Sequence, residues 1–363
     1  MHDLKDRLAS VIDMLRLRKI DQLLLFGNGH HMIDLDNPVA HMTGYRSVGP
    51  AALRIDADGG CCLLTSADEE AAVQDLRISV QLSSNLCRDL PSFVQPAAGA
   101  MVGFGSLPRV LAQTISRLSK LPRIDDDYRH ATAIKTDSEL AAARRATEIA
   151  EDGYLYLLDI AKPGMRECDL AIEINHYMRS KGANDSFLML NCGPFQDAVM
   201  PSSERPIAAG DLLLCELSPS VDGQFTQICR TVSIGPARSV VEEKYPLLVS
   251  AMFNGIHQVK SGTRIGDVCL AIDDHLSAQG YAKFSRPPFI RRRGHGLGCG
   301  STAPGDVSVD NDTLLKSGML FMVHPNQFLP ETGYMMCGEP VVCTSVGFFV
   351  LSSQSAVLAQ TRI

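Results

Sequence analysis

The feature of this sequence that most restricts its fold is an internal repeat in the C-terminal two-thirds of the chain. The stretch KPGMRECDL at 162–170 recurs as KSGTRIGDV at 260–268, and each copy continues into a helical pattern. Each copy then reaches an apolar strand that opens with a glycine and ends in a polar residue, Glu216 in the first and His324 in the second. The repeat therefore predicts two copies of one α/β unit in which Glu216 and His324 are equivalent.

The N-terminal part of the chain has a different pattern. Short β-rich runs at 22–27, 51–55 and 61–65 alternate with helical stretches, which is typical of an α/β domain. The 363 residues also exceed what one hydrophobic core usually organises. We therefore predict a smaller α/β domain at 1–130 and the duplicated domain at 131–363.

Charge and hydropathy restrict the possible partners. The formal net charge of -7 is spread along the chain, without the basic stripe that nucleic acid binding requires. No segment approaches the roughly 20 apolar residues of a membrane span, and the N-terminus has no signal-peptide pattern. The 11 cysteines form no CxxC pair, so we expect reduced thiols in a cytoplasmic protein. These patterns favour a small-molecule substrate and exclude nucleic acid and membrane as partners.

Polar side chains interrupt the apolar strands around Glu216. The VDG sequence at 221–223 is a hairpin signal, and the returning strand brings Gln227 roughly opposite Glu216. A carboxylate and an amide buried without partners would each cost on the order of several kcal/mol. We therefore expect these side chains to face one another or a ligand.

The second half is predicted to contain a matching hairpin. Its return strand is expected to begin at Gly333, so that Cys337 and Glu339 take the places that Gln227 and Cys229 have in the first half. Because the two halves are related by a pseudo-twofold axis, both hairpins should contribute to one shared cavity.

A glycine-flanked histidine supplies a third element of the site. The sequence Gly294-His295-Gly296 lets the backbone approach other groups closely and leaves the imidazole accessible. This arrangement favours a functional role for His295.

Together these residues resemble the M24-like pita-bread family, which includes creatinase, Xaa-Pro aminopeptidase, prolidase and methionine aminopeptidase. The resemblance implies a pita-bread C-terminal domain with an internal pseudo-twofold duplication, preceded by a creatinase-type α/β N-terminal domain. The stretch HMTGY at 41–45 is similar to a strand of that N-terminal domain. The matching motifs in the C-terminal domain are Ile134-Lys135, Arg205 before Gly210-Asp211, Arg230-Thr231, Gly294-His295-Gly296, and Gly318-Met319 leading to His324-Pro325.

The metallopeptidases of this family bind two divalent metals through two aspartates, one histidine and two glutamates. At the matching positions this sequence has Glu216, Gln227, His295, His324 and, with a one-residue gap, Glu339. About two negative charges are missing, so two adjacent dications should not be held well. We therefore expect no paired metals and no cofactor, while a single metal on His295, His324 and Glu216 stays open.

Creatinase is the metal-independent member to which the resemblance points. It uses a histidine as acid and base together with glutamates that bind a guanidinium group. The matching histidine position is Val199 here and the matching glutamate is Cys229, while a further family histidine is replaced by Thr302. Creatinase activity itself is therefore not expected.

The leading functional hypothesis is a metal-independent hydrolase of a small non-peptide substrate. It would cleave a C–N bond in an amide, lactam, cyclic amidine or guanidino group. His324 would be the acid and base, oriented by Glu339 or Glu216, and His295 would polarise the substrate or share the proton transfer.

Other side chains are expected to bind the substrate, and the role of Cys229 stays open. Arg230 is expected to bind a substrate carboxylate as a bidentate fork, with Gln227 and Thr302 also in contact with the substrate. Cys229 is either a small core residue or a nucleophile. By resemblance the N-terminal domain covers the partner subunit's cavity in a homodimer, so that Tyr45 and Arg46 reach the substrate.

Three alternatives stay open. The first is a lyase that acts by proton abstraction on the same fold. The second is a divergent Xaa-Pro-type metallopeptidase with one metal. The third is a catalytically inactive binding module.

Overall fold

The structure, a computed structural model, contains two compact units. One unit comprises Met1–Ser138 with Gly298–Ala303, and the other comprises Glu139–Leu297 with Pro304–Ile363. No described helix has the length and apolar character required to cross a membrane. The structure describes residues 4–27, 29, 32–33, 35–74, 76–94, 99–103, 121–299 and 302–362.

The first unit is built on a five-stranded sheet in the order β4-β3-β2-β1-β5. Strands β1, β2 and β3 are antiparallel neighbours, whereas β5 runs parallel to β1 and β4 parallel to β3. The strands are β1 (Gln22–Gly27), β2 (Ala51–Asp56), β3 (Cys61–Ser66), β4 (Ser79–Ser83) and β5 (Gly99–Gly103). The described α-helices are α1 (Leu4–Arg18), α2 (Pro38–Thr43), α3 (Glu70–Val73), α4 (Leu86–Phe93) and α6 (Asp125–Ala131).

The apolar stripe of α1 explains how this unit closes its core. Val11 and Leu15, four residues apart, lie on one face of the helix and are fully buried. They pack in one cluster with Leu23 and Leu25 of β1. Alternation along β1 sends Leu24 to a second cluster on the opposite side of the sheet, so both faces of the sheet are covered.

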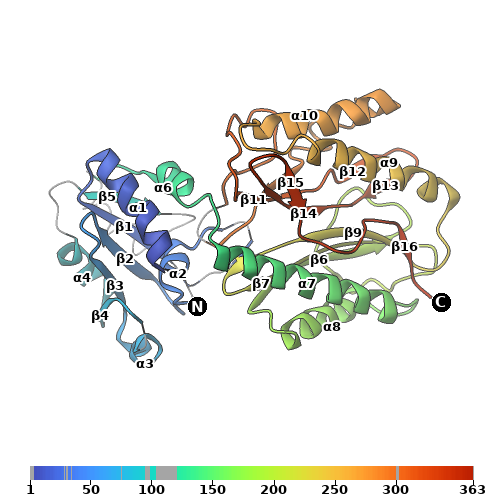
Figure 1. Cartoon of the computed structure of the whole chain (residues 1–363). Helices are drawn as coiled ribbons and strands as arrows, with labels where there is room; N and C mark the ends of the chain where they lie inside the picture. The colour runs from blue at the N-terminus through green and yellow to red at the C-terminus, as the bar shows by residue number, and fades with distance from the viewer. Residues whose placement is uncertain are drawn as a thin grey trace. The chain divides into compact units, whose positions relative to one another are not determined.

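The second unit holds two main sheets between two pairs of helices. Figure 1 shows α7 and α8 on one side of the strands and α9 and α10 on the other. The sheets have the orders β16-β9-β7-β6 and β10-β11-β14-β15, and β12 pairs with β13. The helices are α7 (Asp137–Ile160), α8 (Glu167–Ser180), α9 (Ser239–Ile256) and α10 (Ile265–Leu276). The strands are β6 (Asp185–Gly193), β7 (Leu212–Val221), β8 (Gln224–Phe225), β9 (Ile228–Ser233), β10 (Gly294–Gly296), β11 (Leu320–Val323), β12 (Gln327–Leu329), β13 (Gly333–Met335), β14 (Glu339–Cys343), β15 (Phe348–Val350) and β16 (Ala359–Gln360).

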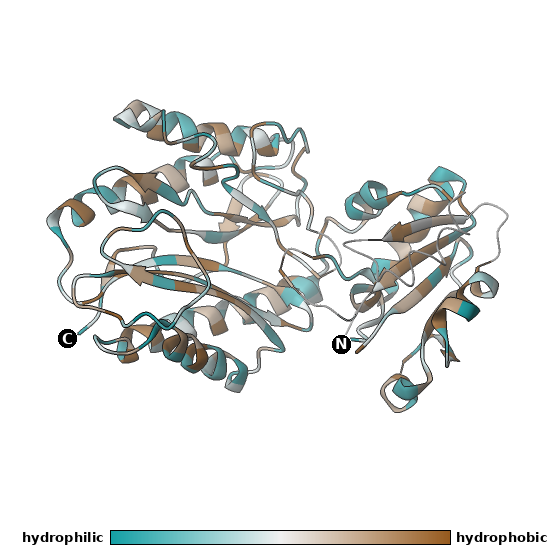
Figure 2. Ribbon diagram, turned by 180° about the vertical axis from the view of Figure 1, so that it is seen from behind, coloured by the Kyte–Doolittle hydropathy of each residue, from teal (hydrophilic) through white to brown (hydrophobic). Residues whose placement is uncertain are grey.

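The core of this unit follows from the apolar strands. Buried residues of α7 and α8, such as Ile149, Leu157 and Ile174, pack against Leu213 and Leu217 of β7. Figure 2 shows this pattern as hydrophobic colour along the strands and as mixed colour on the helices. Helices with one apolar face and strands buried on both faces give the layered α/β arrangement that the sequence predicts.

The duplication is confirmed at the level of individual hydrogen bonds. The Gly164 N–H donates to Ile207 O at 2.9 Å, and the Gly262 N–H donates to Leu315 O at 2.8 Å. Gly164 has φ 89° and Gly262 has φ 90°, and an added Cβ would meet no atom within 4 Å at either position. The left-handed backbone, rather than lack of space, therefore explains why glycine follows the lysine in both repeats.

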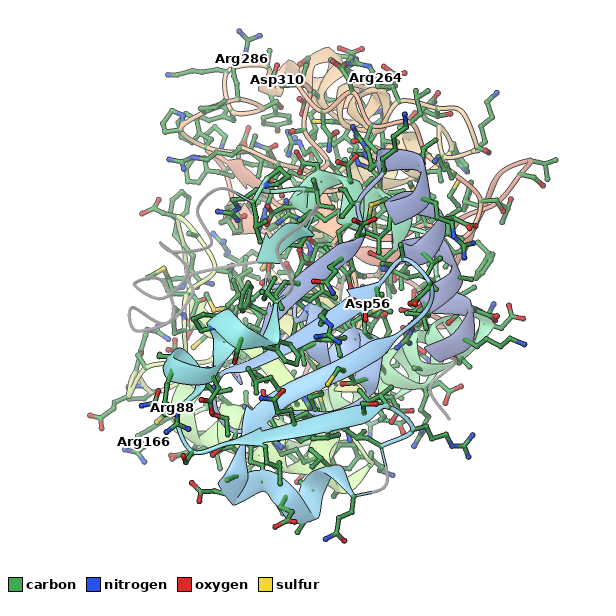
Figure 3. The ribbon with its side chains drawn as sticks, turned by 90° about the vertical axis from the view of Figure 1, so that its left-hand side faces the viewer. Asp56, Arg88, Arg166, Arg264, Arg286 and Asp310 are labelled. Carbon is green, nitrogen blue, oxygen red and sulfur yellow. The ribbon has the colours of Figure 1, made fainter. Side chains whose placement is uncertain are left out.

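The arginine of each repeat also behaves in the same way. Arg166 pairs with Asp169, and Arg264 pairs with Asp267, each three residues further on in the first turn of a helix. Both arginines lie at the periphery of the molecule in Figure 3, where they are labelled. The two copies therefore use equivalent surface pairs to begin α8 and α10.

The hairpins of the two halves are equivalent as well. The Gly210 N–H donates to Ile234 O at 2.8 Å, and the Gly318 N–H donates to Cys343 O at 2.9 Å. These bonds join the start of the first strand of each hairpin to the end of its return strand. Ile234 is therefore equivalent to Cys343.

Counting back along both return strands corrects one predicted register. Cys229 is equivalent to Gly338, and Arg230 is equivalent to Glu339, so the expectation that Glu339 takes the place of Cys229 is wrong by one residue. The ladder agrees, because Cys229 and Gly338 form a bridge and Val323 is paired with Glu339. In a strand a shift of one residue moves a side chain to the opposite face.

Candidate active site

Glu216 lies in β7 at the centre of a small polar group. Its Cα is paired with that of Cys229 across the β7–β9 ladder. Gln227 Nε2 lies 3.5 Å from Glu216 Oε2, and Cys229 Sγ lies 3.9 Å from Glu216 Oε1. The structure therefore brings Glu216, Gln227 and Cys229 together on the hairpin, although Cys229, and not Gln227 as predicted, is the residue opposite Glu216.

Gln227 joins this carboxylate to His295 of β10. The carboxylate only accepts hydrogen bonds, so the amide NH2 points towards Glu216 and the amide oxygen towards the imidazole. His295 Nε2 lies 3.1 Å from Gln227 Oε1, and His295 Nδ1 lies 3.0 Å from Gly296 O. Both ring nitrogens of His295 therefore lie within hydrogen-bond distance of a carbonyl oxygen, which holds the ring in place.

His324 follows β11 and lies beside His295. The ring centroids are 5.3 Å apart and the planes make an angle of 61°. His324 is 7 % exposed, and its Nδ1 has no hydrogen-bond partner among the described residues. Burial, then the positive charge of His295, hold the pKa of His324 well below its usual value. His324 is therefore a neutral imidazole with an available nitrogen.

Gly338 allows the two hairpins to approach at this point. A Cβ on Gly338 would lie 2.7 Å from the Cβ of His324 and 3.1 Å from the Cβ of Cys229. Only glycine leaves room for such contacts. Gly338 therefore faces the site, at the position where the sequence comparison with the metallopeptidases had suggested a glutamate.

Arg230 and Glu339 form a buried ion pair on the other face of these strands. Arg230 Nη2 lies 2.9 Å from Glu339 Oε1, and their side chains are 0 % and 3 % exposed. Arg230 Nη1 also donates to Cys229 O at 3.0 Å and to Gly338 O at 2.8 Å. The Arg230 guanidinium thus binds protein groups of both hairpins that form the site. We assign both residues to the positioning of the two hairpins.

Sequence reasoning missed Tyr334 of β13. Burial, followed by the negative charge of Glu216, raises the pKa of its phenol. Such a charge effect requires Tyr334 to lie near Glu216. The only signal in the sequence was a polar aromatic residue directly after the glycine that begins the return segment.

Three predicted substrate contacts, Tyr45, Arg46 and Thr302, belong to the other unit. The Tyr45 hydroxyl donates to Glu69, and its ring packs in the core of that unit. Thr302 hydrogen-bonds to Asp36. The contacts of Tyr45, Arg46 and Thr302 with a substrate stay predictions.

The donors of this site do not fit a metal ion in the arrangement that the structure shows. Across the described residues, no three His, Cys, Asp or Glu side chains are placed to hold one ion. The Gln227 amide lies between Glu216 and His295, and both nitrogens of His295 are occupied by contacts with carbonyl oxygens. Two dications would in addition need carboxylates that Gln227 and Gly338 do not supply.

Replacing Cys229 by serine is expected to lower kcat by less than about tenfold, whereas loss of a true nucleophile costs on the order of 10⁴-fold or more. Burial and the charge of Glu216 raise the pKa of the Cys229 thiol well above its usual range, so the sulfur stays protonated. Steady-state turnover of the purified variant measures this. A loss as large as that of a removed nucleophile would show that the thiol reacts.

His324 is also expected to make stability depend on pH. Its native pKa lies below the value of about 6.5 in the unfolded chain, so below that pH the unfolded chain binds more protons. The contribution is present above pH 6.5 and is lost as the pH falls, by about 1 kcal/mol per pH unit. Urea unfolding of the native chain and of His324→Gln at pH 7.5 and 5.5 should show a smaller decrease in the variant. An equal decrease in the free energy of unfolding of the native chain and the variant would contradict the neutral state of His324.

The similar proteins match between 59% and 96% of this chain. An uncharacterized peptidase, YqhT, from Bacillus subtilis is 30% identical over 217 residues, which are 59% of this chain and 60% of the relative. A Xaa-Pro dipeptidase from Pyrococcus furiosus is 23% identical over 64% of this chain and 66% of its own length. A Xaa-Pro dipeptidase from Pyrococcus horikoshii is 20% identical over 96% of this chain and 97% of its own length.

Solved structures confirm the predicted fold. A prolidase from Thermococcus sibiricus superposes with a TM-score of 0.86 at 20% identity, over 99% of this chain and 100% of that chain. An X-Pro aminopeptidase from Thermotoga maritima has a TM-score of 0.82 at 20% identity, over 97% of this chain and 99% of that chain. The pita-bread domain with its preceding α/β domain is therefore the architecture of this chain.

The same findings contradict the leading functional hypothesis. The relatives are named peptidases and dipeptidases, which points to peptide bonds and not to a small non-peptide substrate, and metal independence finds no support among them. The alternative of a divergent Xaa-Pro-type peptidase agrees better with these names. The model of metallopeptidase family M24 matches residues 141–345, more than half of the sequence. The chain therefore belongs to metallopeptidase family M24.

Proposed function

We propose that this chain hydrolyses a peptide bond in a short peptide. The observation that carries the proposal is a buried polar chain in which Gln227 joins Glu216 to His295, and the ring of His295 lies beside that of His324. A buried imidazole that is held neutral next to a second imidazole and a carboxylate is typical of acid and base catalysis.

His324 is the general base of the proposed reaction. Its Nδ1 is unpartnered and the ring is neutral, so it accepts a proton from the attacking water. The water oxygen bonds to the carbonyl carbon, and the C–N bond then breaks. His324 returns its proton to the leaving nitrogen, which restores the neutral ring and releases an amine and a carboxylic acid.

His295 stabilises the negative charge that develops on the carbonyl oxygen. In the proposed reaction its ring is protonated, and the positive charge lies in the same buried place as the base, where electrostatic interactions are strong because little water screens them. Glu216 supports that charge through Gln227, whose amide joins the carboxylate to the imidazolium. The site therefore offers one base, one cation and one compensating carboxylate.

A panel of dipeptides tests the proposal. The full chain is assayed for amine release with and without added divalent ions, because relatives belong to a metallopeptidase family although the donors shown here do not fit an ion. We expect hydrolysis of at least one dipeptide, and its loss in His324→Gln but not in His176→Ala, an exposed histidine of α8. No hydrolysis of any dipeptide under either condition would refute the proposal.

A further inference from the structure

The segment that follows β11 contains a second buried polar atom without a partner. Asn326 is 3 % exposed, and its Oδ1 has no hydrogen-bond partner among the described residues. A buried acceptor left without a donor costs about 1–3 kcal/mol. Since Asn326 lies two residues after the proposed base His324, a ligand in the site is the natural source of that donor.

The backbone at Asn326 is unusual for a residue with a side chain. Its φ is 28°, in the left-handed region that glycine, asparagine and aspartate tolerate better than other residues. Strained conformations of this kind persist where the surrounding structure holds them, and they cluster at functional sites. The chain therefore keeps a costly conformation at a position beside the base.

Tyr334 fixes the orientation of the Asn326 amide. The phenol oxygen accepts a hydrogen bond from the Asn326 side chain, which can donate only through its NH2 group. The amide oxygen is thereby left as the free acceptor. The charge of Glu216 also acts on Tyr334, so Asn326, as the hydrogen-bond partner of Tyr334, belongs to the same polar site.

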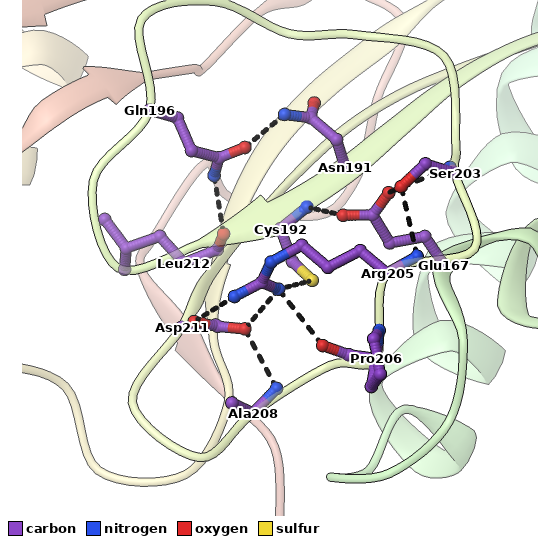
Figure 4. Close-up of polar contacts among 10 residues, drawn as sticks. All are labelled: Glu167, Asn191, Cys192, Gln196, Ser203, Arg205, Pro206, Ala208, Asp211 and Leu212. Atoms are coloured by element: carbon purple, nitrogen blue, oxygen red, sulfur yellow. Dashed lines mark hydrogen bonds and ion pairs between the residues drawn. The ribbon is translucent and has the colours of Figure 1, made fainter.

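Tyr334 is itself held by a loop of the first half. Its backbone N–H donates to Gln196 O at 2.6 Å. The Gln196 side chain donates to Leu212 O at 2.7 Å and accepts from Asn191, as Figure 4 shows. A residue of β13 is therefore fixed to strands β6 and β7.

We propose that Asn326 is a specificity-determining residue whose Oδ1 accepts the N–H of the peptide bond to be cleaved. The inference rests on the proposed function. His324 must deliver a proton to the leaving nitrogen, and we place the acceptor, two residues further along the same segment, next to that nitrogen. An ordinary peptide bond has an N–H, whereas a bond to proline has none. The site should therefore favour ordinary peptide bonds over prolyl bonds.

Three dipeptides that share their first residue test this inference. Their second residues are alanine, N-methylalanine and proline, and only the first offers an N–H. In the native chain we expect kcat/KM for the alanine peptide to exceed that for the N-methylalanine and proline peptides by about tenfold or more. A native chain that prefers the proline peptide would overturn the inference.

Two variants separate specificity from a structural role. Asn326→Gly accepts the left-handed backbone but has no acceptor, and it should reduce the ratio to near one. Asn326→Asp accepts the same backbone and keeps an acceptor oxygen, so it should retain the preference. A purely structural role would lower activity on all three peptides equally and leave the ratio unchanged in Asn326→Gly, which would refute the inference.

Measurements of ligand affinity test the inference without depending on turnover. Calorimetric dissociation constants for the same three dipeptides should show the same order in the native chain and lose it in Asn326→Gly. If no dipeptide is hydrolysed but this order of affinities is found, the proposed function fails while the inference about Asn326 stands. Equal affinities for the three ligands in the native chain would defeat the inference itself.

Discussion

Replacing Arg230 by methionine is expected to lower the free energy of unfolding by about 3–5 kcal/mol, the usual cost of removing one partner of a buried ion pair. Glu339 would be left in the core without its countercharge. Burial already raises the pKa of Glu339, against the effect of Arg230. The carbonyls of Cys229 and Gly338 would also lose a charged donor.

Urea unfolding at neutral pH measures this loss. Glu148→Ala is the matched control, because Arg145 and Glu148 form an exposed pair on α7 whose removal should cost no more than about 1 kcal/mol. The double variant Arg230→Met/Glu339→Gln removes both charges and should recover part of the stability. A loss in Arg230→Met no larger than that of the control would mean that the pair does not hold the hairpins.

His324→Gln is expected to reduce kcat by about 10²–10⁴-fold, the usual contribution of a general base. Glutamine is similar in size and polar, but its amide cannot accept a proton at neutral pH. The effect should fall mainly on kcat, because proton transfer belongs to the transition state and not to substrate binding. Stopped assays with a dipeptide that the native chain hydrolyses measure it.

The control for that experiment is His176→Ala, which removes an exposed imidazole from α8 and should leave kcat unchanged. Urea unfolding of both variants shows whether the site has kept its structure. A His324→Gln variant that is folded and retains full turnover would exclude His324 as the base.

The convergence of Glu216 and His324 could be predicted because the repeat is recognisable from local sequence motifs. A lysine-glycine turn and a glycine before an apolar strand each have a backbone cause that is visible in the sequence. Equivalent positions in two copies of a unit then meet at the pseudo-twofold axis. The pairing of Gln227 with Glu216 followed from the turn at 221–223.

The register of the second hairpin could not be predicted in the same way. The position opposite His324 is Gly338, which has no side chain to show on which face it lies. The neighbouring Glu339 has a carboxylate, and it was therefore assigned to the position equivalent to Cys229. Period-two patterns define the two faces of a strand but not which residue lies opposite which, and an error of one residue exchanges the faces.

Asn326 and Tyr334 were missed for another reason. Neither belongs to the motifs by which the repeat is recognised in the sequence, and an isolated asparagine after a proline usually indicates a turn. Their importance depends on burial and on the orientation of one amide, which tertiary packing determines. Local patterns in a sequence carry no such information.

The pairing of Arg230 with Glu339 also bears on how a duplicated domain can be assembled. These residues occupy equivalent positions, yet they carry opposite charges and meet across the axis that relates the halves. Two copies of the first half would bring two guanidinium groups together, and two copies of the second half would bring two carboxylates together. Only unlike halves neutralise each other. The two halves of this chain are therefore complementary in charge at this position, and neither is complementary to a second copy of itself.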